Sequence, residues 1–266
     1  MDDAGFDTTV AHPARRYNYW LGGTYHFAAD RESGDEFARR FPGVRTGARA
    51  NRAMVLRATR HLAAEAGIRQ FLDIGSGLPT AENTHQAAQR VAPDSRVVYV
   101  DNDPLVTAYA DALCDGDPRG RAAYIEADVR DPGAVLAHPV LRDTLDLSRP
   151  VALLLVAVLH FVPGDGAAQP IVRRLLDALP AGSHLVATHA TMDFSPPEHR
   201  AEHRRMRDAG RSDVWTRDRA EFTELFDGLD LVDPGVVPVS EWRPDPGTTP
   251  PAPRDVAVWG AVGRRG

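Results

Sequence analysis

The spacing of apolar and polar residues changes character about a quarter of the way along the chain. Between residues 14 and 62, apolar residues recur at helical spacing, with breaks at residues 22–23 and 41–43 where glycine and proline occur. This pattern predicts interrupted helices. Beyond Gly67, short apolar runs alternate with helical segments, as expected of a chain that returns to one sheet through helices.

The short apolar runs predict buried strands. The run at 151–156 is apolar throughout, which is typical of a central parallel strand covered on both faces. Helices are expected over 81–91, from Asp103-Pro104 onward, around 171–179 and over 222–229, because capping residues or helical spacing occur there. The expected strands are 71–74, 96–100, 122–125, 151–156, 183–188, 231–239 and 255–262, with a proline-rich loop at 243–254.

This alternation predicts an α/β fold with an open, mostly parallel sheet and helices on both faces. The last two strands are joined by a loop and would form an antiparallel edge. Residues 1–60 are expected to form a helical cap over the sheet domain of residues 61–266.

Three aspartates occur where the first three strands should end: Asp73, Asp101 and Asp128. The carboxyl ends of parallel strands meet at one edge of the sheet, where ligands of such folds bind. Gly75 and Gly77 follow the first acid and allow the backbone to approach a ligand closely.

This arrangement matches the polar groups of S-adenosylmethionine (SAM). An acid and backbone donors near the first loop would meet the amino-acid end, Asp101 would accept the ribose hydroxyls, and Asp128 would meet the adenine amino group. The expected cofactor-binding residues are Asp73, Gly75, Ser76, Gly77, Asp101, Asn102, Asp128 and Val129.

Two other interpretations compete with a SAM site. A dinucleotide fingerprint needs a third glycine, and the chain has Pro79-Thr80 at that point, so a nicotinamide site is disfavoured. The aspartates would alternatively only cap helices, as Asp103 is expected to do.

Seven stretches spread along the chain form a specific pattern: residues 14–32 (ARRYNYWLGGTYHFAADRE), 50–52 (ANR), 70–80 (QFLDIGSGLPT), 97–104 (VVYVDNDP), 126–131 (EADVRD), 150–163 (PVALLLVAVLHFVP) and 234–245 (PGVVPVSEWRPD). In these stretches the chain resembles the actinobacterial SAM-dependent methyltransferases long known only as a domain of unknown function. The resemblance implies a Rossmann-like class I methyltransferase fold, SAM as cofactor and a helical N-terminal cap, but defines no acceptor.

The N-terminal stretch departs from the pattern of these relatives. Asn18 stands where they usually have an acid, and Thr24, Tyr25 and His26 replace residues of the lysine and asparagine or aspartate type. Charges expected to face the cofactor are therefore missing, and the acceptor chemistry of the relatives does not carry over.

Candidate catalytic residues come from two places. His160 follows the fourth strand, where a base would face the substrate, although a packed histidine is an equal alternative. Tyr17, Tyr25 and His26 would line the site from the cap; Tyr17 would alternatively pack in the seam that docks the cap.

No metal site is expected. Residues 199–203 match the H-x-x-E-H pattern of some zinc proteases, but the surrounding arginines and the absence of an apolar face favour a solvated helix.

Composition narrows the setting. The 266 residues carry a net charge of −6, with arginine as the sole basic type besides histidine, so nucleic acid is not an expected partner. The longest apolar run is too short for a membrane helix, no leader pattern is evident, and the single cysteine, Cys114, suits a reducing compartment. We therefore expect a cytoplasmic protein that binds a small-molecule substrate, with a homo-oligomer left open.

Three functions remain open at this point. The main hypothesis is a SAM-dependent methyltransferase acting on a small molecule in specialised metabolism. A second is an enzyme that cyclises or cleaves the aminocarboxypropyl arm of SAM and releases methylthioadenosine, suggested by the altered cap. A third is a SAM-binding protein without catalysis.

Overall fold

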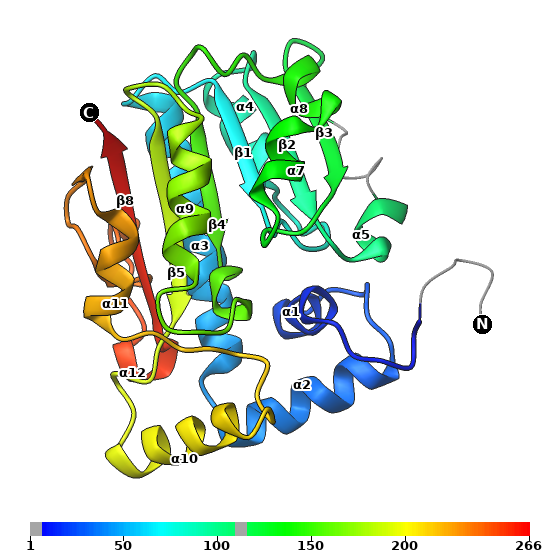
Figure 1. Cartoon of the computed structure of the whole chain (residues 1–266), viewed down its shortest axis with the longest axis vertical. Coiled ribbons are helices and arrows are strands. Elements are labelled where there is room, and N and C mark those ends of the chain that lie inside the picture. Colours follow the sequence, from blue (N-terminus) through cyan, green and yellow to red (C-terminus); the bar gives the residue numbers. More distant parts are fainter. Residues whose placement is uncertain (1–6, 110–115) are drawn as a thin grey trace.

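A computed structural model describes residues 7–109 and 116–266, and Cys114 lies outside them. Its centre is an eight-stranded sheet with the order β3-β2-β1-β4-β5-β8-β6, and β7 pairs with β8 (Figure 1). The strands are β1 (Gln70–Ile74), β2 (Arg96–Asp101), β3 (Arg121–Glu126), β4 (Ala152–Val156), β5 (His184–Ala190), β6 (Leu229–Leu231), β7 (Val237–Pro238) and β8 (Val258–Arg265).

The sheet is parallel from β3 to β5 and antiparallel beyond. β1 to β5 pair in parallel, whereas β8 runs antiparallel to β5, β6 and β7. The predicted α/β architecture with an antiparallel edge is therefore confirmed. The order of the strands reverses between β1 and β4, which is the place where a sheet of this kind binds its ligand.

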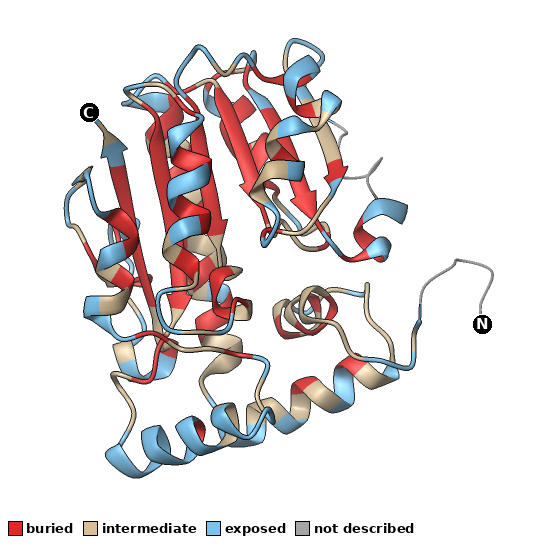
Figure 2. Ribbon diagram, viewed as in Figure 1, coloured by how far each residue is buried: buried red, intermediate tan, exposed pale blue. Residues whose placement is uncertain are grey.

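Side chains alternate between two cores because successive residues of a strand face opposite sides of the sheet. Phe71 and Leu154 belong to a core shared with α3 (Val44–Ala64) and α4 (Thr84–Val91). Leu72 and Leu153 belong to a core shared with α7 (Pro132–Ala137), α8 (Pro139–Thr144) and α9 (Ala168–Asp177). Both faces of the central strands are covered, and Figure 2 shows these strands buried along most of their length.

The helices are placed in three layers. Those on the sheet faces are α3 (Val44–Ala64) and α4 (Thr84–Val91) on one side, and α7 (Pro132–Ala137), α8 (Pro139–Thr144), α9 (Ala168–Asp177) and α11 (Arg219–Thr223) on the other. Short helices at loops are α5 (Pro104–Ala108), α12 (Pro253–Val256) and the 3-10 turns η1 (Leu159–Phe161) and η2 (Glu224–Phe226).

The third layer is the cap. α1 (Pro13–Leu21) and α2 (Ala28–Arg40) lie beyond the carboxyl ends of the strands, and α10 (Pro197–Asp208) extends the layer (Figure 1). α3 differs from them, because Met54, Val55, Ala58 and Leu62 are buried in the core of the sheet domain. The domain boundary expected at residue 60 remains a prediction, and it falls within this helix.

Several predicted elements were wrong near the C-terminus. The strand expected over 231–239 is divided into β6 and β7, because Gly235 adopts a left-handed φ of 79° and its N–H closes a turn onto Val232. The beginning of the strand expected over 255–262 is instead α12, which starts at Pro253. Leu229, expected in a helix, begins β6.

The short helices α7 and α8 were not predicted. Each has only six residues, too few for a periodic apolar pattern, and each starts with a proline preceded by a capping side chain, that of Asp131 or His138. The helix expected over 199–203 is confirmed as part of α10, of which only His203 is buried.

Candidate active site

The three aspartates lie at the carboxyl edge of the sheet. Asp73 is in β1, Asp101 is the last residue of β2, and Asp128 follows β3 by two residues. Asp73 and Asp101 are 4% and 6% exposed, so both carboxyl groups are largely withdrawn from water. Burial at this depth has to be offset by specific polar contacts, which differ for the two acids.

The loop after β1 is shaped by glycines. Gly75 has a φ of 76°, and its N–H and that of Ser76 donate to the Val100 carbonyl at 2.8 and 3.1 Å. A Cβ atom at Gly75 would lie 2.5 Å from Val158. Gly77 also has a left-handed φ, 66°, but no heavy atom lies within 4 Å of a Cβ built there. The backbone at Gly77 therefore borders open space.

Asp101 fastens this loop to β2. Its Oδ2 accepts a hydrogen bond from the Gly77 N–H at 2.7 Å, and its Oδ1 accepts one from the Asp103 N–H at 3.0 Å. Burial raises the pKa of Asp101, and these two backbone N–H donors oppose that shift. Each carboxylate oxygen retains a second lone pair, so the group still has capacity for a ligand hydroxyl.

Asp73 has different neighbours. The Thr84 hydroxyl donates to its Oδ2 at 2.7 Å. Burial raises the pKa of Asp73, while the Thr84 hydrogen bond and the positive charge of Arg52 on α3 oppose the rise. Arg52 thus brings a cation from the N-terminal region close to the first strand.

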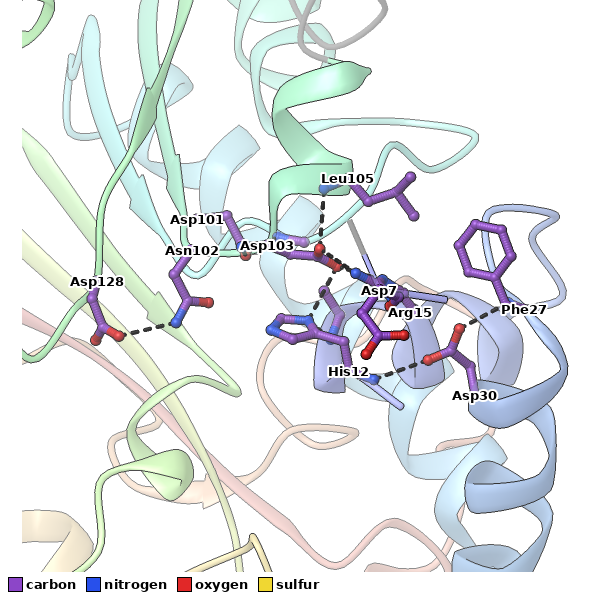
Figure 3. A network of polar contacts seen from close by, with 12 residues as sticks. Asp7, His12, Arg15, Phe27, Asp30, Asp101, Asn102, Asp103, Leu105 and Asp128 are labelled. Carbon is purple, nitrogen blue, oxygen red and sulfur yellow. Dashed lines mark hydrogen bonds and ion pairs between the residues drawn. The ribbon is translucent and has the colours of Figure 1, made fainter. Parts of the chain in front are cut away.

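The cap is bound to the turn after β2 by a buried ion pair (Figure 3). Arg15 of α1 donates two hydrogen bonds to the Asp103 carboxylate, at 3.0 Å from Nε and 2.9 Å from Nη2. Asp103 also accepts from the Leu105 N–H and caps α5. Although its burial has the opposite effect, the hydrogen bonds from His12 and Arg15 hold the pKa of Asp103 well below its usual range.

His12 adds a second cap contact. Its Nδ1 lies 3.1 Å from Asp103 Oδ2 and 3.3 Å from the Ala14 amide nitrogen. The protonated Nδ1 would donate to the carboxylate, whereas the unprotonated Nδ1 would accept from the amide. In Figure 3 the ring lies on the side of Asp103 that faces Asn102.

Asp128 and Asn102 form a more open pair. Asn102 Nδ2 donates to Asp128 Oδ2 at 3.0 Å (Figure 3). Arg130 forms an ion pair with the same carboxylate. The Arg130 hydrogen bond lowers the pKa of Asp128 to about 2, despite partial burial. Val129 is instead buried, with its side chain packed in the core under α7.

His160 lies in η1, just after β4, and is 9% exposed. Its Nδ1 is 3.5 Å from the Ala190 amide nitrogen, and its carbonyl accepts from the Trp215 N–H. Burial lowers the pKa of His160 to about 3, and the charges of Arg217 and Arg16 add to the effect. The ring is therefore neutral at physiological pH.

The three cap residues have separate surroundings. The Tyr17 hydroxyl donates to the Ala48 carbonyl at 3.0 Å and accepts from Asn51 at 2.9 Å, which favours the packing interpretation for this residue. The Tyr25 ring packs on Tyr109 after α5, at 4.3 Å between centroids. His26 contacts the Gly23 carbonyl and Arg31 within the cap.

Asn18, the residue that replaces an acid, joins the cap to the glycine loop. Its Oδ1 accepts from the Tyr25 N–H at 2.9 Å, and its Nδ2 is 3.5 Å from the Pro79 carbonyl. Where related proteins usually have an acid, this chain therefore has a neutral amide that contacts both the cap and the loop after β1.

Asn51 and Arg52 were not among the predicted site residues, whereas Ser76 was. Asn51 Oδ1, Arg52 Nε and Ser76 Oγ are buried without a hydrogen-bond partner among the described residues. Arg52 acts on both Asp73 and Tyr17, and Asn51 bonds to Tyr17, so α3 brings these atoms towards the first strand. The stretch at 50–52 contributed to the family resemblance, but no spacing rule connects it to Asp73.

The H-x-x-E-H segment does not assemble a metal site. His203 packs against Phe41 with 5.9 Å between ring centroids, whereas His199 is exposed. Across residues 7–109 and 116–266, no group of three or more His, Cys, Asp or Glu side chains is placed to hold a metal ion.

Comparisons with known proteins identify the family. The model of the S-adenosyl methyltransferase family matches residues 2–266. This chain belongs to that family. A DUF574 family protein from Streptomyces avermitilis is 48% identical, with a TM-score of 0.90 and coverage of 98% of this chain and 99% of that one. A candidate methyltransferase from Thermobifida fusca is 41% identical, with a TM-score of 0.88 and coverage of 97% and 96%.

The predicted class I fold, the methyltransferase class and SAM as cofactor are thereby confirmed. The comparison with curated proteins gave no significant match. In the part of the chain that the structure describes, no helix has the length and apolar character needed to cross a membrane.

The residues at the carboxyl edge fit this cofactor. Open space borders Gly77. Near it, Arg52 Nε and Ser76 Oγ are buried donors without a partner among the described residues, and Asn51 Oδ1 is a buried acceptor without one. The Asp73 carboxylate adds further acceptor oxygens. An amino-acid zwitterion needs donors for its carboxylate and acceptors for its ammonium group, which is the combination found here.

Proposed function

We propose that this chain transfers the methyl group of SAM to a small-molecule acceptor in the specialised metabolism of the cytoplasm. The observation that carries the small-molecule assignment is the cap. Arg15 and Asn18 attach α1 to the turns after β2 and β1, so a folded macromolecule would have to displace this helix to reach the carboxyl edge. The net charge of −6 also disfavours a nucleic-acid acceptor.

The adenosine part of SAM is assigned to the β2 and β3 edge. Asp101 would accept the two ribose hydroxyls through its remaining lone pairs, while Gly77 and Asp103 hold its orientation. Asp128 and Asn102 together present an acceptor and a donor to the adenine edge. Val129 would contribute its backbone, because its side chain is packed in the core.

The amino-acid end of SAM is assigned to the space between the first loop and α3. Arg52 Nε and the Ser76 hydroxyl would donate to the carboxylate, and Asn51 Oδ1 would accept from the ammonium group. Asp73 would provide the negative charge that balances the cations at this end. Gly75 and Gly77 keep the backbone free of side chains along the cofactor.

SAM supplies a methyl group on a positively charged sulfur, and an in-line attack on that carbon depends mainly on positioning. His160 would position the acceptor rather than remove its proton, because a group with a pKa of about 3 is a weak base at neutral pH. Tyr25 and His26 remain candidate contacts from the cap, and Tyr17 would act indirectly by holding Asn51.

Incubation of the purified protein with SAM tests the proposal by mass spectrometry. S-adenosylhomocysteine is expected to accumulate only when metabolite fractions or defined small acceptors are added. Methylthioadenosine formed from SAM alone, faster than in a protein-free control, would instead establish cleavage of the aminocarboxypropyl arm. SAM that is bound but unchanged with every acceptor class would support the non-catalytic alternative.

A further inference from the structure

A cavity lies at the edge of the sheet opposite the candidate SAM site, where β1, β4 and β5 begin. Its volume is about 470 Å³, and its lining includes Arg69, Gln70, Arg149, Gly182, His184 and Arg264. β8 ends at this edge because it runs antiparallel to β5, so Arg264 lies beside His184 as its register partner. In Figure 1 this is the upper edge, near the C-terminus and away from α1.

The lining is strongly basic in a chain of negative net charge. It contains three arginines and a histidine and no carboxylate. Neither guanidinium group of Arg149 and Arg264 has a hydrogen bond or ion pair with a described residue, although the charge of Arg149 acts on Asp146 and Asp230 of β6 is the register partner of Arg264. Arg69 is partly neutralised, since its Nε lies 3.4 Å from Asp94.

The backbone around the cavity is fixed by its neighbours. Gln70 Nε2 donates to the Asp146 carbonyl at 2.8 Å, and Gln70 Oε1 accepts from the Asp146 N–H at 2.6 Å. The Gly182 N–H donates to the Arg265 carbonyl at 2.8 Å. The loops that carry Arg149 and Gly182 are therefore held in place before any ligand arrives.

His184 provides a buried polar group in this lining. The residue is 5% exposed, and its Nδ1 has no hydrogen-bond partner among the described residues. Burial lowers the pKa of His184 to about 4; the Gly182 carbonyl opposes this shift, while Arg264 on β8 and His61 on α3 add to it. A bound anion would raise the pKa of His184 and so favour its imidazolium form.

We propose that this cavity is a binding site for a phosphate-bearing small molecule, separate from the SAM site. Guanidinium groups bind phosphate through paired N–H donors, and Arg149 and Arg264 have theirs available. His184 supplies a further donor from the wall of the cavity. The volume leaves room for a small organic group beside the phosphate. The few basic side chains of the lining suit one phosphate group rather than a long polyanion.

Calorimetric titration of the protein saturated with S-adenosylhomocysteine tests this site with inorganic phosphate, sulfate and succinate. We expect one phosphate or sulfate to bind per chain, and Arg149→Gln and Arg264→Gln each to weaken it about tenfold, since each removes a charged hydrogen bond. The matched control is Arg173→Gln on the exposed side of α9, which removes the same charge elsewhere and should leave binding unchanged.

Sulfate remains a dianion between pH 5.5 and 7.5, so its affinity reports the protonation of the protein. Binding is expected to tighten towards pH 5.5 in the wild type and to lose this dependence in His184→Gln, with thermal unfolding used to verify that the variant folds. The proposal is overturned if phosphate does not bind, if Arg173→Gln weakens binding as much as the site variants, or if succinate binds equally well through the same arginines. An unchanged pH dependence in His184→Gln would exclude His184 from the site.

Discussion

At the scale of single residues, a substitution at Gly77 is expected to affect both the stability of the fold and the binding of SAM. Gly67 has a similar φ, 69° against 66°, and neither position has a heavy atom within 4 Å of a built Cβ. Gly77→Ala and Gly67→Ala should therefore lower the free energy of unfolding by a similar amount, about 1 kcal/mol. Only the Gly77 variant should also weaken SAM binding, as measured by calorimetry, because its methyl group enters the space assigned to the cofactor. Equal SAM affinities of the two variants would contradict this assignment.

Asp101 is expected to dominate the ribose contact. Asp101→Asn replaces one acceptor oxygen by an NH₂ group, which would face the N–H of Gly77 or Asp103 and lose a ribose hydrogen bond. We expect SAM affinity to fall by at least about tenfold. Asp177→Asn on the exposed surface of α9 is the control. A variant with wild-type affinity would show that another residue binds the ribose.

The burial of His160 predicts a pH dependence of stability. Its folded pKa, about 3, lies below the ordinary value of 6.5, so the unfolded chain takes up a proton first as the pH falls. Stability is therefore lost below pH 6.5, by about 1.4 kcal/mol at pH 5.5 from this residue. Denaturant unfolding should show that His160→Gln loses less stability than the wild type between pH 7.5 and 5.5.

The exposed His199 serves as a control for this effect, and His199→Gln should follow the wild type over the same pH range. If His160→Gln and the wild type lose equal stability, His160 is not buried in its neutral form.

His160→Gln also tests the part of His160 in catalysis. A positioning role predicts a higher KM for the acceptor without a change in the pH profile of kcat between pH 5 and 8.

At the scale of elements, the contact between α1 and the β2–α5 turn is expected to hold the cap. The Asp103 side chain is fully buried and that of Arg15 is 4% exposed, so Arg15→Gln leaves a buried carboxylate without its cation. Removal of one partner of such a pair costs about 3 kcal/mol or more. Hydrogen exchange should accelerate in α1 and α5, and SAM affinity should fall because Asp103 also orients Asp101.

Arg39→Gln provides the matched control on α2, because Arg39 is exposed and has no ion pair with a described residue. Its exchange rates and SAM affinity should equal those of the wild type. Faster exchange in Arg15→Gln that spreads evenly over the sheet would instead mean that α1 unfolds only with the whole molecule. In that case the cap would not be a separate unit in the energetic sense.

At the scale of the whole molecule, the two edges of the sheet are expected to bind their ligands independently. S-adenosylhomocysteine at a hundred times its Kd should raise the free energy of unfolding by about 2.7 kcal/mol, because it binds the folded state alone. Saturating sulfate should add its own increment, measured by thermal unfolding. A combined shift far from the sum would reveal coupling through β1, β4 and β5, which border both sites. Asp101→Asn should reduce the first increment and leave the second intact.

The sequence by itself determined the architecture and the positions of the three aspartates along the carboxyl edge of the sheet. Alternating apolar runs and helical spacing are local properties, and they were sufficient for the central strands, the antiparallel edge and the three aspartates at strand ends. Short-range signals failed where the chain is irregular. Pro234 and Gly235 divide an apolar stretch into β6 and β7, and α7 and α8 are too short to show a period.

Only the tertiary structure decided which groups meet and which lose water. Arg15 and Asp103 are 88 residues apart in the chain, and Arg52 acts on Asp73 from a helix that was predicted to lie mostly in the cap. The protonation of His160 and His184 likewise follows from burial and from charges on other elements. Because solvent exposure and long-range pairing are set by the packing of distant segments, the identity of a residue gives its possible chemistry and its surroundings select one form of it.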